Sequence, residues 1–79
     1  MVFPRAEKEL AERAARYLKA ELKRADVTYD ELADRLKQYG FEETRASIAN
    51  KLARATMSAH FFLASLAAIG CEVMRLQDV

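Results

Sequence analysis

The residues best suited to recognition chemistry lie between Thr44 and Ala55. If this stretch is helical, a rotation of about 100° per residue puts Ile48 and Leu52 on one side. The opposite side carries small and hydrogen-bonding side chains, namely Ala46, Ser47, Asn50, Ala53 and Arg54. Asn can bond an adenine edge with two hydrogen bonds, Arg can do the same at guanine, and an alanine methyl can touch a thymine methyl. This face therefore has the chemistry needed to read base edges in duplex DNA.

Two further cations flank that face. Arg45 falls in the first turn and Lys51 at one border, where both are better placed for phosphates than for bases. No Asp or Glu occurs from Thr44 to Cys71, although the net charge of the chain is only +1. The alternative is a solvated helix face that is basic for solubility alone.

A helix–turn–helix arrangement is predicted to position this face. Thr28 and Glu31 have the spacing of a capping box, which starts a helix expected over residues 29–39. Gly40 is suited to a left-handed stop, and the next helix is expected over 44–55. Such a layout presents its second helix to the DNA major groove. Tyr29, in the first turn, fits either a phosphate contact or the apolar stripe of its helix.

A long helix is predicted before this unit, over residues 4–25. Pro4 suits its first position, and Leu10, Ala14, Leu18 and Leu22 recur every four residues to form a core-facing stripe. The helix is longer than so small a domain requires. We therefore treat residues 1–17 as an extension that projects or packs on a second copy, with a solvated charged face.

The last helix, expected over 58–69, is apolar on almost every side. A helix of that kind is either the centre of a core or is partly covered by another subunit. The C-terminal tail, residues 71–79, has some strand character over residues 71–76, so we expect either a short strand or an irregular tail there. A lone short strand needs a partner, for which the tail of a second subunit is one candidate. Both features favour a homodimer, whose interface would include Phe61, Phe62, Cys71, Val73, Met74 and Leu76.

Length and composition place the chain in the all-α class. Its 79 residues form one domain, residues 1–79, rich in apolar residues and with only two Gly and one Pro. The single cysteine, Cys71, excludes an intramolecular disulfide and makes a reducing, cytoplasmic setting the default. No stretch is long and apolar enough to span a bilayer, so we expect no membrane association.

Catalytic and metal-binding motifs are not found in the sequence. It has no glycine-rich phosphate loop, no Cys-x-x-Cys pair and only one histidine, His60. We therefore expect that the protein is not an enzyme and that it has no metal site and no cofactor. No small-molecule effector is evident. The competing function is a protein-binding adaptor that docks on a toxin or on the transcription machinery through its helices.

The stretch from Leu18 to Leu66 resembles the lambda-repressor-like (Xre-type) helix–turn–helix family. The similarity is carried by Val27-Thr28-Tyr29-Asp30-Glu31-Leu32-Ala33, by Gly40-Phe41, by Ile48 and Leu52, and by Leu63 to Gly70. The spacing between Ala33 and Thr44 is longer than in that family. The resemblance implies a small bacterial transcription regulator in which the helix over 44–55 reads DNA and Tyr29 contacts phosphate. The whole chain is also similar to a family of small bacterial proteins of unknown function.

Overall fold

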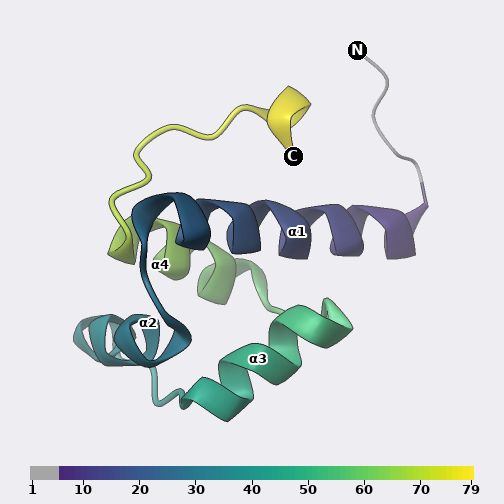
Figure 1. Ribbon diagram of the computed structural model, residues 1–79. Coiled ribbons are helices and arrows are strands. Elements are labelled where there is room, and N and C mark those ends of the chain that lie inside the picture. The colour runs from purple at the N-terminus through teal and green to yellow at the C-terminus, as the bar shows by residue number, and fades with distance from the viewer. Residues whose placement is uncertain (1–5) are drawn as a thin grey trace.

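Four α-helices form the fold in the computed structural model, which describes residues 6–79. In chain order they are α1 (Glu7–Ala25), α2 (Tyr29–Leu36), α3 (Arg45–Arg54) and α4 (Ala59–Ala68). Two short 3-10 helices accompany them, η1 (Lys37–Tyr39) after α2 and η2 (Leu76–Asp78) in the tail. Figure 1 shows α1 lying across α3 and α4, with α2 closing one end of the bundle. The predicted four-helix, all-α architecture is confirmed.

The long first helix is confirmed over most of its predicted length. Its acidic first turn and basic last turn both complement the helix dipole, and Asp26 ends it in a left-handed conformation with φ 58°. The predicted start at Pro4 lies outside the described residues. Its fully buried residues begin near the middle of the helix, at Ala15, Leu18 and Leu22. The N-terminal end of α1 extends past the other helices (Figure 1).

The capping box that starts α2 is present as predicted. The Thr28 hydroxyl accepts a hydrogen bond from the Glu31 amide at 3.1 Å, and the Glu31 carboxylate accepts one from the Thr28 amide at 2.9 Å. Val27 and Leu32, at the positions of a hydrophobic staple, are both buried. The entry into α2 is therefore determined by local sequence.

The second helix is shorter than the predicted span of 29–39. Regular α-helix ends at Leu36, and the last turn tightens into η1. The Phe41 amide donates to the Leu36 carbonyl at 3.2 Å, and Gly40 adopts the expected left-handed conformation with φ 85°. Phe41 then packs edge-on against Phe61, with ring centroids 6.2 Å apart. This contact links the turn to α4.

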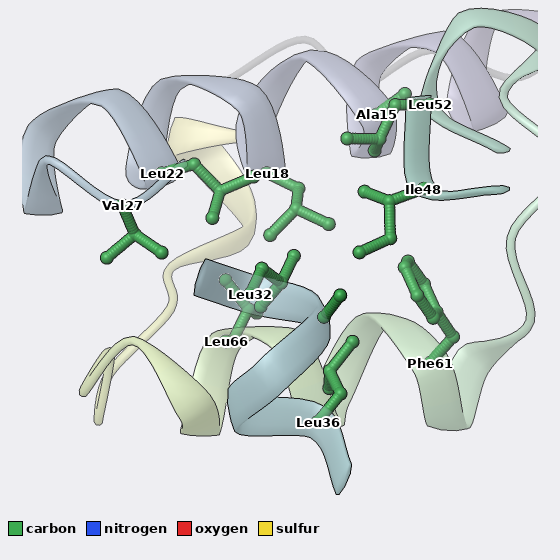
Figure 2. Packing of buried hydrophobic residues seen from close by; sticks show 11 residues of the cluster. Ala15, Leu18, Leu22, Val27, Leu32, Leu36, Ile48, Leu52, Phe61 and Leu66 are labelled. Atoms are coloured by element: carbon green, nitrogen blue, oxygen red, sulfur yellow. The ribbon is translucent and has the colours of Figure 1, made fainter. Parts of the chain in front are cut away.

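All four helices contribute to one hydrophobic core (Figure 2). Its buried members are Ala15, Leu18, Leu22, Val27, Leu32, Ala33, Leu36, Ile48, Leu52, Phe61 and Leu66. The bounds of α3 and α4 agree with the predicted spans of 44–55 and 58–69 to within one residue at each end. Thr44 and Ser58 are their N-cap residues, and each accepts a hydrogen bond from an amide of the first turn.

The tail does not form the strand that its alternating pattern suggested. Within residues 6–79 there is no strand, so no edge exists against which the tail could pair. Residues 71–75 instead run as irregular chain toward the outer side of α1 and end in η2 (Figure 1). The guanidinium of Arg13 donates to the backbone carbonyl of Val79, with Nε at 2.9 Å. Of the two forms predicted for this segment, a short strand or a tail, this chain has the tail, which is held through α1.

Candidate functional site

The outer face of α3 is exposed, as the spacing of its apolar residues predicted. Ile48 and Leu52 are buried, at 0% and 1% exposure, and they fix which side of the helix faces inward. The exposed residues of α3 are Arg45, Ala46, Asn50, Ala53 and Arg54. The sequence-based division of this helix into an inner and an outer side therefore agrees with the structure.

Ser47 is placed differently from the rest of the predicted site. Its hydroxyl accepts a hydrogen bond from the Thr44 amide at 2.8 Å, while the Thr44 hydroxyl accepts one from the Ser47 amide at 3.0 Å. This reciprocal pair caps the start of α3. The Ser47 hydroxyl also donates to Glu43 Oε1 at 2.6 Å. The spacing Thr-x-x-Ser was the available signal for this capping role, and the side chain is not free to contact a partner.

Lys51 is also engaged within the domain. Its ammonium group forms an ion pair with the Glu43 carboxylate and lies 4.9 Å from the centroid of the Phe61 ring. The Glu43 side chain is 8% exposed and that of Lys51 34%. Burial alone would raise the pKa of Glu43, but hydrogen bonds from Lys51 and Ser47 outweigh it, and the pKa is lowered. Lys51 is thus neutralised by its neighbour.

A hollow of about 510 Å³ adjoins the other flank of α3. Arg45 contributes to it from α3, Thr28 and Tyr29 from the start of α2, and Lys19 and Lys23 from the last turns of α1. Asp30 is the single acidic residue of its lining. Helix N-termini favour anions because the first amides lack intrahelical partners. Cations from two helices and one helix N-terminus therefore meet beside the exposed face.

The position of Tyr29 is compatible with either of the roles considered for it. It is partly buried against the core and also lines the hollow beside Arg45. Lys19 and Lys23, which line this hollow from α1, were not singled out from the sequence. Their spacing of four residues puts both on one side of α1, but only the packing of α1 against α3 brings that side to Arg45.

The predicted dimer residues fall into three groups. Phe61 is 1% exposed and belongs to the core, so it is not available to a partner while the domain is folded. Phe62, Cys71 and Met74 are partly buried against that core. Val73 and Leu76 are 75% and 60% exposed. Leu63 on α4, which was not predicted, is 61% exposed.

A second hollow, of about 540 Å³, lies between α1 and the end of the tail. Arg13, Arg16 and Arg24 line it together with Tyr17 and the end of the tail. Arg24 is paired with Glu21, and Arg13 with the Val79 carbonyl. Burial and the neighbouring Cys71 raise the pKa of the Tyr17 phenol. Of these contacts, the bond from Arg13 to Val79 holds the end of the tail against α1.

Two other classes of site can be assessed for the part of the chain that the structure describes. Among residues 6–79, no three His, Cys, Asp or Glu side chains are grouped so that they could hold a metal ion. Over the same residues, no helix has the length and apolar character required to cross a membrane.

Comparison with protein families gives one match, over residues 10–74, to a domain of unknown function (DUF6471). The chain belongs to this family. The match includes α2, α3, α4 and most of α1, and hence both the exposed face and the hollow beside it. Searches of curated proteins and of solved structures found no significant match. The family description carries no activity.

Proposed function

We propose that this protein binds double-stranded DNA in a sequence-specific manner and acts as a small transcription regulator. The observation that carries the proposal is the exposed, acid-free outer face of α3, which lies beside the cationic hollow at the start of α2. Helix–turn–helix proteins place such a second helix in the major groove. The resemblance to the lambda-repressor-like family supports the same docking.

Each exposed residue of α3 has a role in this proposal. Asn50 and Arg54 read base edges, because their side chains can each form paired hydrogen bonds with a purine. Ala46 and Ala53 allow the helix backbone to come close to the groove floor. Arg45 contacts a phosphate at the edge of the hollow. Ser47 maintains the cap of α3 and does not read a base.

The hollow beside Arg45 is the proposed phosphate site. Lys19 and Lys23 supply cations, and the start of α2 supplies backbone amides and the Tyr29 hydroxyl. Each phosphate neutralised by such groups releases condensed counterions, so affinity falls with salt. Lys19→Gln and Arg45→Gln should therefore weaken binding to every duplex and flatten the slope of log affinity against log salt by roughly one unit each.

A two-fold homodimer would contact enough base pairs to recognise an operator. One helix contacts only a few base pairs, whereas two modules roughly 34 Å apart read both halves of a palindrome. The exposed Leu63, Val73 and Leu76 provide apolar surface for such a contact.

The same apolar surface favours the second candidate, a protein-binding adaptor. In that case Leu63 and the tail would dock on another protein, and α3 would be solvated. Retention on heparin or on immobilised duplex DNA separates the two functions. A DNA-binding protein elutes at a salt concentration that falls when Arg45 is replaced, whereas an adaptor is not retained.

The direct test is selection of duplexes from a random pool, followed by affinity measurement on the enriched sequence. The proposal expects an enriched motif that is bound at least about a thousandfold more tightly than unselected DNA, which is the low end of typical specificity ratios. Recovery of a random pool after repeated rounds would contradict it.

A further inference from the structure

The Glu43–Lys51 ion pair lies at the edge of the proposed DNA-binding surface. At about 100° per residue, Arg45 and Lys51 fall on opposite flanks of the outer face of α3. A helix in the major groove has a phosphate backbone on either side. Arg45 lines the cationic hollow on one flank, whereas Lys51 on the other is neutralised by Glu43. The two flanks therefore differ in charge although each carries a cation.

Three contacts hold Lys51 in this arrangement. The Glu43 carboxylate receives its ammonium group, the Phe61 ring lies beneath the charge at 4.9 Å, and Ser47 donates to the other carboxylate oxygen at 2.6 Å. Ser47 is itself fixed by the cap of α3. Glu43 is thus oriented by Ser47 as well as by Lys51, and its side chain is only 8% exposed.

We infer that Glu43 limits the affinity of this protein for DNA by withholding Lys51 from the phosphates. The inference rests on the proposed function and concerns the regulation of that same surface. In the parent protein Lys51 makes no phosphate contact, because breaking the ion pair would leave the largely buried Glu43 carboxylate without a counter-charge, which is unfavourable. Removing the charge of Glu43 frees Lys51, whose flexible stem then reaches the neighbouring backbone.

Glu43→Gln is the variant that tests this inference, because glutamine keeps an oxygen for Ser47 and removes the charge that holds Lys51. Glu42→Gln is its matched control. Glu42 is the adjacent residue, is exposed, and makes no ion pair within residues 6–79. Both variants raise the net charge equally, so any difference between them reports the release of Lys51.

The measurement is fluorescence anisotropy with one fixed duplex over a salt series, made on parent and variants whose circular dichroism shows folded helices. We expect Glu43→Gln to bind several-fold more tightly at low salt and to steepen the slope of log affinity against log salt by roughly one unit beyond Glu42→Gln. In the double variant Glu43→Gln/Lys51→Gln, the slope should return to that of the parent. The double variant also retains a hydrogen-bonding pair if the single variant unfolds.

The release of Lys51 can also be measured without DNA, by nuclear magnetic resonance. The Lys51 methylene resonances should be displaced by the Phe61 ring in the parent and in Glu42→Gln, and should move toward ordinary values in Glu43→Gln. Equal salt slopes for Glu43→Gln and Glu42→Gln, with DNA binding intact, would overturn the inference and leave the proposed function standing. If the parent protein binds no duplex, both the inference and the proposed function are wrong.

Discussion

The ammonium group of Lys51 lies 4.9 Å from the centroid of the Phe61 ring and is paired with Glu43. This relationship joins the turn before α3, the flank of α3 and the core side of α4. It divides the surface of α3 into an exposed face, where Asn50 and Arg54 are unobstructed, and a flank whose charge is neutralised.

The Glu43 pair should make stability depend on pH. The lowered pKa of Glu43 means that the folded protein favours the ionised carboxylate more than the unfolded chain does. Its contribution is therefore complete above the ordinary value of 4.5 and is lost as pH falls through the lower pKa of the folded state. Urea midpoints of the parent and of Glu43→Gln should differ at pH 7 and converge toward pH 3. A constant difference across that range would contradict the prediction.

The buried hydroxyl of Ser65 should cost stability. Ser65 is 0% exposed, and its Oγ has no hydrogen-bond partner among the described residues. An unpaired buried hydroxyl is unfavourable by about 1–3 kcal/mol, so Ser65→Ala should stabilise the domain by about 1 kcal/mol. Ser58→Ala, at the N-cap of the same helix, should destabilise it by a similar amount because it loses the bond from the Phe61 amide. Urea midpoints that move in the same direction for both would show that Ser65 is satisfied.

The caps and the core should differ in their effect on stability. Thr28→Ala loses the capping box and should cost about 1 kcal/mol. Leu32→Ala or Leu66→Ala leaves a cavity in a core where these side chains are at most 5% exposed, and should cost about 2–5 kcal/mol. Thermal and urea unfolding followed by circular dichroism measure both. Leucine variants with midpoints like that of Thr28→Ala would contradict the assigned core.

Local features of this fold could be predicted from the sequence, whereas contacts between elements could not. The Thr28–Glu31 box and the inward side of α3, with Ile48 and Leu52, depend on spacing within one helix. The Glu43–Lys51 pair depends on how the turn packs on Phe61, and the approach of Lys19 to Arg45 depends on the pose of α1 against α3. Alternation along the tail resembles a strand, but pairing requires a second edge that the sequence pattern does not supply.

The proposed dimer predicts a mass of twice the 9.0 kDa of one chain in light scattering at micromolar concentration. Val73 and Leu76 are the exposed apolar residues of the tail, so Val73→Asp/Leu76→Asp should yield the monomer with α-helical content unchanged. A parent mass near 9.0 kDa, unaffected by truncation after Gly70, would end the dimer proposal and favour a monomeric adaptor.

The most direct test of DNA reading by α3 is the affinity of single variants for the selected duplex and for duplexes altered at one base pair. Asn50→Ala and Arg54→Ala should each lose about 1–3 kcal/mol on the selected site and discriminate less at one position. Ala53→Ser, on the same exposed face, is the control for a change that removes no donor. Binding by Asn50→Ala and Arg54→Ala as tight and as selective as that of the parent would contradict the assignment of α3 as the reading helix.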